Sequence, residues 1–250
     1  MSLNGKTIII TGASSGIGEA AAKMFASQGA NLVLGARRQE RLKKVANEIV
    51  QSGGVANFIV GDVSDEAYAA SLVEFAEGRF GALDGAFNNA GIIGELGPIT
   101  EMSTENWQNV LQTNLTSGYY AAKYQIPALK KRGNGSIVFT STFVGHTVGL
   151  PGMAAYAASK AGIIGMVQVL AVEHGTDKIR VNALLPGGTK TEMAGGDPKA
   201  HEWVSGLHAL KRMAEPEEIA SAAAFLLSDQ SSFMTGSAMI VDGGNSINKT

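Results

Sequence analysis

Short apolar runs that alternate with longer amphipathic segments constrain the fold of this 250-residue chain more than any other feature. The runs are rich in β-branched residues and apolar on both faces, which is typical of strands buried in a parallel sheet. They occupy residues 6–11, 31–36, 55–60, 83–89, 136–142, 179–185 and 238–243. Alanine-rich segments of helical length lie between them, at 16–28, 38–52, 65–80, 104–131, 153–174 and 215–228. This order predicts one α/β domain over residues 1–250, a doubly wound (Rossmann) parallel sheet of about seven strands flanked by helices.

Composition excludes several classes of function. The net charge of −2 offers no basic field for nucleic acid or for an anionic membrane surface. The chain has no cysteine, and its four histidines have no acidic partners at ligand spacing, so we expect neither disulfides nor a metal site. We find no secretory leader and no apolar stretch that approaches the roughly 20 residues of a membrane helix. We therefore expect a cytoplasmic protein with a small-molecule partner.

A glycine-rich turn follows the first apolar run, where a doubly wound fold binds its ligands. In "TGASSGIG" (11–18), Gly12 allows a sharp turn, Gly16 lets the backbone approach a ligand, and Gly18 lets helix and strand pack closely. The free N–H groups at the helix start then suit a pyrophosphate, although an ordinary glycine-rich turn is the alternative. The Lys-Ser/Thr pair of a phosphoryl-transfer loop is missing. The candidate cofactor residues here are Gly12, Ser14, Ser15, Gly16, Ile17 and Gly18.

The second and third runs end in residues that suit the rest of a dinucleotide. A free ribose 2′-OH requires a carboxylate after the second strand, but this chain has Ala36 followed by Arg37 and Arg38. Paired arginine N–H groups match a phosphate, so we predict a 2′-phosphate and hence NADP(H); the alternative is that both arginines only open a solvated helix. After the third run, Asp62 accepts from the adenine amino group and Val63 packs on the ring, unless Asp62 is only a turn and cap residue.

A tyrosine and a lysine one helical turn apart carry the strongest signal for chemistry. Tyr156 and Lys160 share one face of the predicted 153–174 helix, among small residues. Taken alone, the pair is also explained by a tyrosine packed on the stem of a snorkelling lysine. The other unusual residues follow the remaining strands: "NNAG" at 88–91, Asn114 within a predicted helix, hydroxyls at 140–142, and "PGGT" at 186–189.

Together these motifs resemble the short-chain dehydrogenase/reductase family over essentially the whole chain, and 3-oxoacyl-carrier-protein reductases in particular. The motifs that carry the resemblance are TGxxxGIG at 11–18, NNAG at 88–91, Asn114, YxxxK at 156–160, PGG-T at 186–189 and DGG at 242–244. The resemblance implies a catalytic set of Tyr156, Lys160, Asn114 and one hydroxyl. Thr142 stands at the family's usual serine position and Ser141 directly before it, so both are candidates, with Thr142 slightly favoured.

The resemblance further implies hydride transfer between NADP(H) and a carbonyl or secondary alcohol. Tyr156 would be the general acid and base, Lys160 would hold the nicotinamide ribose, and Asn114 would hold a water in a proton relay. We expect the positive charges of Lys160 and of oxidised nicotinamide to lower the pKa of the Tyr156 phenol. Thr189 or Thr191 would fix the carboxamide. The cofactor residues implied by the family are Asn89, Ala90, Gly91, Tyr156, Lys160, Pro186, Gly187, Thr189 and Thr191.

The family also suggests a mobile substrate lid at about 190–212 and a homo-oligomer, either a tetramer or a dimer. Met193, Trp203 and Leu207 would contact an apolar substrate or would only pack the lid down. A non-catalytic NADP(H)-sensing protein and a methyltransferase are rival functions, but neither needs Tyr156 and Lys160. An NAD-preferring dehydrogenase is a third, against which the arginines after the second strand argue.

Overall fold

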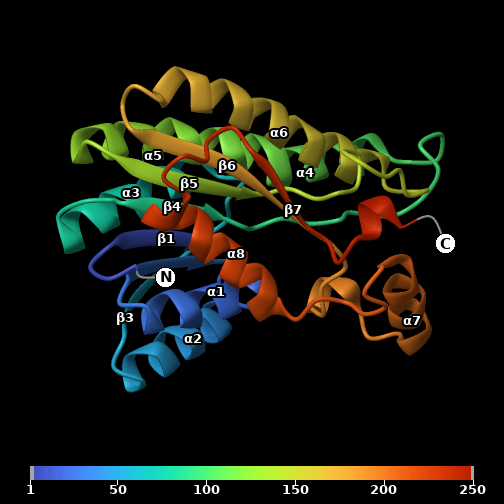
Figure 1. Ribbon diagram of the computed structural model, residues 1–250, viewed down its shortest axis with the longest axis horizontal. Helices are drawn as coiled ribbons and strands as arrows, with labels where there is room; N and C mark the ends of the chain where they lie inside the picture. The colour runs from blue at the N-terminus through green and yellow to red at the C-terminus, as the bar shows by residue number, and fades with distance from the viewer. Residues whose placement is uncertain (1–2, 249–250) are drawn as a thin grey trace.

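The computed structural model describes residues 3–248 and contains the predicted doubly wound sheet (Figure 1). The strands are β1 Thr7–Thr11, β2 Asn31–Ala36, β3 Val55–Val60, β4 Gly85–Asn88, β5 Gly135–Thr140, β6 Ile179–Pro186 and β7 Ala238–Val241. All neighbouring pairs are parallel, in the order β3-β2-β1-β4-β5-β6-β7. The winding direction reverses between β1 and β4, which places the expected ligand crevice beyond the carboxyl ends of these strands.

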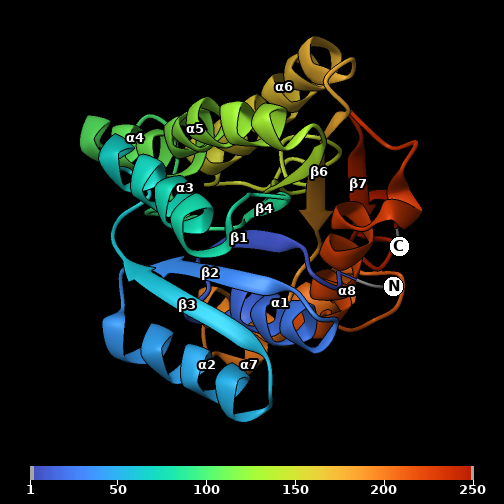
Figure 2. The same cartoon turned by 90° about the vertical axis from the view of Figure 1, so that its left-hand side faces the viewer.

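Two helical layers cover the sheet, one on each face (Figure 2). One layer holds α1 Gly16–Ser27, α2 Gln39–Gln51 and α8 Pro216–Leu227; the other holds α3 Glu66–Phe80, α4 Thr104–Leu111, α5 Ser117–Arg132 and α6 Ala154–His174. Strand β1 shows why three consecutive isoleucines stand at its centre. Ile8 and Ile10 lie in the core under the first layer and Ile9 in the core under the second, all fully buried, because successive side chains point to opposite faces.

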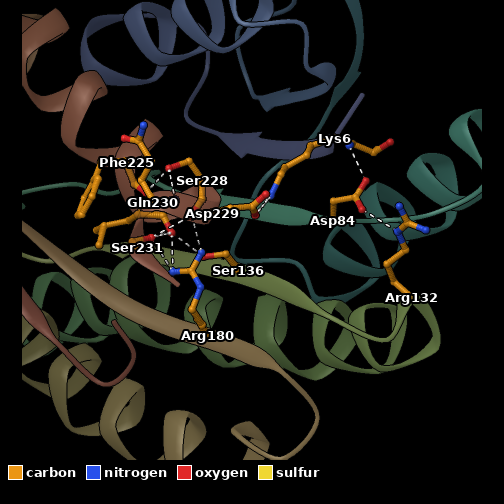
Figure 3. A network of polar contacts seen from close by, with 12 residues as sticks. Lys6, Asp84, Arg132, Ser136, Arg180, Phe225, Ser228, Asp229, Gln230 and Ser231 are labelled. Atoms are coloured by element: carbon orange, nitrogen blue, oxygen red, sulfur yellow. Dashed lines mark hydrogen bonds and ion pairs between the residues drawn. The ribbon is translucent and has the colours of Figure 1, made fainter. Parts of the chain in front are cut away.

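A polar network ties the amino ends of the strands together, at the end of the sheet opposite the expected crevice (Figure 3). Arg180 opens β6, and its Nη1 and Nη2 donate to the carbonyl oxygens of Leu226 at 2.8 Å and Ser228 at 3.0 Å. These carbonyls end α8, where no further helical N–H remains to bond them. Nearby, Asp84 accepts from Arg132 Nε at 2.7 Å. The charged groups at this end are therefore engaged in holding the fold.

The predicted single helix over 104–131 is interrupted by a π-helical turn. Between α4 and α5 lies η1, Gln112–Thr116, in which Asn114 is 3% exposed. Asn114 Oδ1 accepts from the backbone N–H of Ile92 at 2.8 Å, and its Nδ2 donates to the carbonyl of the same residue at 2.8 Å. Such turns hold one extra residue and recur at functional sites. The extra residue lets this poor helix former turn inward.

The 190–212 segment is predicted as a mobile lid, in which Gly195, Gly196 and Pro198 suit a hinge, but it contains more regular structure than that. It holds the short 3₁₀ helix η2, Glu192–Ala194, and the helix α7, Pro198–Leu207. Asp197 caps α7 by accepting from the N–H of Lys199 at 3.0 Å, and Pro198 occupies the first turn. This Asp-Pro pair is a helix-start signal that reading the segment as a hinge overlooked. Two more 3₁₀ turns, η3 Asp229–Ser231 and η4 Asn245–Ile247, flank β7.

The expectation that no segment is long and apolar enough to cross a membrane is wrong for α6. An 18-residue window of this 21-residue helix reaches a mean hydropathy of 1.4 because alanine, isoleucine and valine outweigh its few polar residues. Of the apolar window, 39% is buried within the fold. Helices packed inside globular proteins pass the same test, and α6 packs on η1, α4 and β6. The composition therefore assigns no membrane segment.

Candidate active site

A cavity of about 540 Å³ opens beyond the carboxyl ends of β1, β2, β4, β5 and β6. It gathers nearly all the predicted site residues from segments far apart in the sequence. Those that line it are Gly12, Ser14, Ser15, Gly16, Ile17, Arg37, Arg38, Asp62, Val63, Asn89, Ala90, Gly91, Ser141, Thr142, Tyr156, Lys160, Pro186, Gly187, Thr189 and Thr191. Gly18 and Asn114 do not line it. They lie behind its wall, where they shape two of its turns.

The glycine turn has the tight geometry that a dinucleotide site requires. Gly12 and Gly16 have φ angles of +69° and +54°, in the left-handed region that other residues avoid. A Cβ atom on Gly18 would lie 2.2 Å from the carbonyl oxygen of Gly12, and one on Gly16 would lie 2.9 Å from Thr191 Cγ2. Ser15, at the N-cap of α1, makes no side-chain capping bond, so the N–H groups of the first turn stay available to an anion. The turn thus fits a pyrophosphate.

Of the two arginines after β2, Arg38 is the one that contacts the glycine turn. Its Nη2 donates to Ser15 Oγ at 2.5 Å and to Ser14 Oγ at 3.2 Å. Arg37 is more exposed, 66% against 44%, and its Nη1 lies 3.4 Å from Asp62 Oδ2. Sequence reasoning favours Arg37 as the reader of a 2′-phosphate. The geometry puts Arg38 beside two hydroxyls that can donate to the same phosphate.

Asp62 makes the turn contact that the sequence left open as an alternative. Its Oδ1 accepts from the Ser64 N–H at 2.9 Å and from Ser64 Oγ at 2.8 Å. Burial raises the pKa of the Asp62 carboxyl. These two hydrogen bonds and the Arg37 charge lower that pKa by more, so it lies below the ordinary value. Asp62 and Val63 nevertheless both line the cavity, and the turn contact leaves Oδ2 on the side of Arg37.

The turn after β4 is held in place by two side chains. Thr11 Oγ1 accepts from the backbone N–H groups of Asn89 at 3.1 Å and Ala90 at 3.3 Å. From the other side, Asn114 bonds Ile92 and also donates to Ser159 Oγ at 3.0 Å, which links the turn to α6. Thr11 was not among the predicted site residues, although it is the first letter of the glycine motif.

One phenol and one hydroxyl meet inside the cavity. Strand β5 ends at Thr140, and Ser141, 2% exposed, donates its Oγ hydrogen to the carbonyl of Lys160 at 2.8 Å. The next hydroxyl, that of Thr142, is hydrogen-bonded with the Tyr156 phenol. Lys160 Nζ donates to the Thr140 carbonyl at 2.7 Å and lies 6.0 Å from the centroid of the Tyr156 ring. Ser141 is therefore engaged with the backbone, whereas Thr142 accompanies the phenol.

The protein's own groups do not lower the pKa of Tyr156 in the way the sequence analysis expected. Burial raises the pKa of the phenol, and the hydrogen bond with Thr142 offsets only part of that rise. Burial also lowers the pKa of Lys160 to about 8, since the ammonium has a carbonyl but no carboxylate as its neighbour. Tyr156 is thus protonated at neutral pH, ready to act as an acid. Its use as a base depends on a positive charge brought by a bound cofactor.

The "PGGT" turn after β6 is hydrogen-bonded to a buried histidine, His208, that sequence analysis missed. His208 is 1% exposed; its Nε2 accepts from the Gly188 N–H at 3.0 Å and its Nδ1 bonds the Val204 carbonyl at 2.7 Å. A Cβ atom on Gly188 would lie 2.4 Å from Val204 Cγ1. Thr189 Oγ1 donates to the Gly187 carbonyl at 3.0 Å. Only the proximity of His208 to the cavity in space reveals this role.

The far end of the cavity is apolar. Its walls here are Ile92, Ile93, Phe143, Val144, Leu150, Met153, Met193, Trp203, Val204, Leu207 and Met213. Met193, Trp203 and Leu207, the three lid residues singled out in the sequence, are among them. The charged residues of the cavity are Arg37, Arg38, Asp62, Lys160 and Glu192. Within residues 3–248 there is no group of three or more histidine, aspartate and glutamate side chains that could hold a metal ion.

The chain is similar to known oxidoreductases over almost its whole length. A family model described as enoyl-(acyl carrier protein) reductase matches residues 12–246. Cyclohexanol dehydrogenase of Acinetobacter is 40% identical, over 96% of this chain and 94% of the relative. A 2,5-dichloro-2,5-cyclohexadiene-1,4-diol dehydrogenase of Sphingobium indicum is 39% identical, over 97% of both chains. The crystal structure of a short-chain type dehydrogenase/reductase from Mycobacterium marinum superposes with a TM-score of 0.94 at 34% identity, covering 99% of this chain and 98% of that one.

Proposed function

Since the chain belongs to the short-chain dehydrogenase/reductase family, and is therefore an oxidoreductase with a nicotinamide cofactor, we propose that it interconverts an apolar secondary alcohol and its ketone with NADP(H). One observation carries the proposal. The Tyr156 phenol and the Thr142 hydroxyl meet in the same cavity whose other end is built from the glycine turn and Arg38. A hydride donor and a proton donor can therefore reach the same carbonyl group.

The chemistry assigned to the protein is proton transfer and positioning. The bound nicotinamide supplies or accepts the hydride. In reduction, the Tyr156 phenol donates its proton to the carbonyl oxygen as the hydride adds to the carbonyl carbon, and the carbonyl becomes a hydroxyl. In oxidation, the phenolate takes that proton back. The Thr142 hydroxyl holds the substrate oxygen, and Lys160, fixed by its bond to Thr140, holds the ribose of the cofactor. Asn114 acts through the turn that it braces, since its side-chain amide already bonds Ile92 and Ser159.

The choice of NADP(H) rests on the surroundings of Arg38. A guanidinium and two serine hydroxyls form a donor-rich corner, and β2 ends in Ala36, which cannot repel a phosphate. A carboxylate at that strand end would favour a free 2′-hydroxyl instead. Arg37 lies on the Asp62 side of the same corner and adds a second positive charge.

The substrate class rests on the apolar end of the cavity. Aromatic and aliphatic side chains such as Phe143, Leu150 and Trp203 surround the space beyond Tyr156. Apart from Lys160, the charged cavity residues lie with the glycine turn, β2, β3 and the start of the 190–212 segment. The relatives named above act on six-membered rings that carry hydroxyl groups. We therefore propose an alicyclic secondary alcohol or ketone, covered by the 190–212 segment as a lid.

Titration of the purified protein with NADPH and NADH, followed by nicotinamide fluorescence, tests the cofactor assignment. Steady-state turnover of cyclohexanol, cyclohexanone and matched open-chain compounds, followed by the absorbance of the reduced ring, tests the substrate class. We expect NADPH to bind more tightly than NADH, and the cyclic compounds to turn over faster than the matched open-chain ones. Binding of NADPH without any turnover would favour the rival function of an NADP(H) sensor, and preferential binding of NADH would refute the role of Arg38.

We also propose that the enzyme works in the cytoplasm as a homo-oligomer, either a dimer or a tetramer. Support for an oligomer comes from α6, where the large apolar side chains of Val169 and Val172 are 55% and 85% exposed. Light scattering after size-exclusion chromatography distinguishes these assemblies from a monomer.

A further inference from the structure

One carboxylate of the 190–212 segment, that of Glu192, pairs with two arginines at the start of α2. Glu192 lies in η2, and its Oε2 accepts from Arg38 Nη1 at 2.7 Å, while its Oε1 pairs with Arg41 Nη1 at very short range. Arg38 directly precedes α2, and Arg41 lies in its first turn. The contact thus joins two segments about 150 residues apart in the sequence, on a rim that also contains Ser14 and Ser15.

The Arg38 guanidinium therefore donates hydrogen bonds to two sets of acceptors. Its Nε and Nη2 bond the serine hydroxyls of the glycine turn, and its Nη1 bonds Glu192. Hydrogen bonds from Arg38 and Arg41 hold the pKa of Glu192 below its usual range, so the carboxylate is ionised at neutral pH. A phosphate monoester at this corner would bring close to two more negative charges. Glu192 would then have to share Arg38 with it or move away.

We propose that Glu192 is a specificity-determining residue, an internal carboxylate that competes with the 2′-phosphate of the cofactor for Arg38 and so limits the preference for NADPH over NADH. The inference rests on the proposed function, because it assumes that a nicotinamide dinucleotide occupies this cavity. It differs from the familiar acidic residue at the end of β2, a position that here is Ala36. The carboxylate comes instead from the opposite wall, out of the predicted lid.

The competition should act on one cofactor only. NADH has no phosphate to place against Arg38, so the Glu192–Arg38 pair can persist when NADH binds, whereas NADPH must disturb it. Both partners are about half exposed, 44% for Arg38 and 55% for Glu192. Pairs of this kind have modest strength and are weakened by salt. We therefore expect a change in the NADPH/NADH affinity ratio of about two- to fivefold at low ionic strength, shrinking at high salt.

The first test compares wild type with Glu192→Gln, which keeps the size of the side chain and removes its charge. Kd values for NADPH and NADH are measured by nicotinamide fluorescence. Glu202→Gln is the matched control, because Glu202 is an exposed glutamate of the same segment with no ion pair among the described residues. Glu192→Gln should tighten NADPH about two- to fivefold and leave NADH and the control nearly unchanged. An unchanged ratio, weaker NADPH binding, or equal tightening of both cofactors would overturn the proposal.

A second comparison asks whether the effect passes through Arg38. In an Arg38→Gln background, Glu192→Gln should no longer alter the NADPH/NADH ratio, since the group for which the two anions compete is gone. A full-sized effect in that background would overturn the proposal. If wild type binds neither cofactor, the proposed function fails. If it binds them and only the Glu192 variants behave contrary to expectation, the proposed function stands and this inference alone falls.

Discussion

Replacing Thr142 by valine tests which of two neighbouring hydroxyls takes part in the reaction. Valine keeps the branched shape of threonine and removes the hydroxyl, so a loss of rate reports on that group. The oxygen is hydrogen-bonded with the Tyr156 phenol and accepts from the N–H of Val144 at 3.3 Å. Removing a donor that holds a substrate oxygen on which charge develops costs about 10²–10³ in kcat. We expect a loss of that size in Thr142→Val, and near-normal rates in Thr142→Ser.

Ser141→Ala is the matched comparison, and its expected effect lies in stability. Ser141 Oγ donates to the Lys160 carbonyl at 2.8 Å in a site that is 2% exposed. Losing this buried hydrogen bond costs about 1–3 kcal/mol. In a chain of this size each kcal/mol lowers Tm by about 2–4 °C. The Tm of Ser141→Ala should therefore lie several degrees below that of wild type, while its turnover rate stays close to the wild-type value.

The assay combines kcat at saturating cofactor, the Kd of NADPH from fluorescence and Tm from thermal unfolding. Measuring cofactor binding separates a catalytic defect from a damaged site. The opposite pattern, in which Ser141→Ala loses two orders of magnitude in kcat and Thr142→Val keeps its activity, would refute the assignment of Thr142. Equal losses in both would show that the segment after β5 acts as a unit.

Three further changes test other parts of the site. Tyr156→Phe should abolish turnover and leave NADPH affinity within about twofold of wild type. Because burial raises the pKa of the phenol, the rate of alcohol oxidation by the wild-type enzyme should increase as pH rises. An oxidation rate that falls with rising pH would contradict the role of Tyr156 as the base. Burial lowers the pKa of Lys160 from 10.5 to about 8, so the unfolded chain holds this proton more tightly and wild-type stability should rise between these two pH values. This lowered pKa costs the folded state about 3 kcal/mol of stability at neutral pH. Lys160→Met should therefore raise Tm at neutral pH while removing activity. A lower Tm would contradict the cost assigned to the buried charge. Gly18→Ala would place a Cβ atom 2.2 Å from the Gly12 carbonyl oxygen. NADPH binding, measured by fluorescence, should therefore weaken by at least about tenfold. An affinity equal to that of wild type would show that the turn can shift.

The sheet and the positions of the motifs could be predicted because both leave local signals. The centre of strand β1 is apolar on both faces, since Ile8, Ile9 and Ile10 pack into two cores, and each strand of this kind ends in a turn with recognisable residues. Parallel strands bring their carboxyl ends to one edge, so residues that follow different strands meet in one cavity. The glycines, the hydroxyls after β5 and Tyr156 with Lys160 could thus be assembled from the sequence alone.

What could not be predicted depends on contacts between distant segments. Sequence reasoning favours Arg37 as the reader of the 2′-phosphate, and only the fold shows that Arg38 is the arginine that reaches the glycine turn. Nothing near Glu192 in the sequence indicates that it pairs with two residues about 150 positions earlier. The pKa of Tyr156 was expected to fall because a charged lysine is near. In the structure burial raises this pKa instead, the Thr142 hydrogen bond is what lowers it, and the balance depends on the depth of packing.

The π-helical turn over Gln112–Thr116 has a consequence for how this chain can change in length. A regular helix turns by about 100° per residue, and the wider π-helical turn absorbs one additional residue without rotating α4 against α5. Deleting one residue from the turn would therefore restore ordinary helical geometry with both flanking helices in phase, but Asn114 would no longer face Ile92 and Ser159. The extra residue thus serves the polar contacts of Asn114 and is not needed to pack α4 and α5. Single-residue deletions between α4 and α5 should accordingly damage the site more than the packing of the two helices.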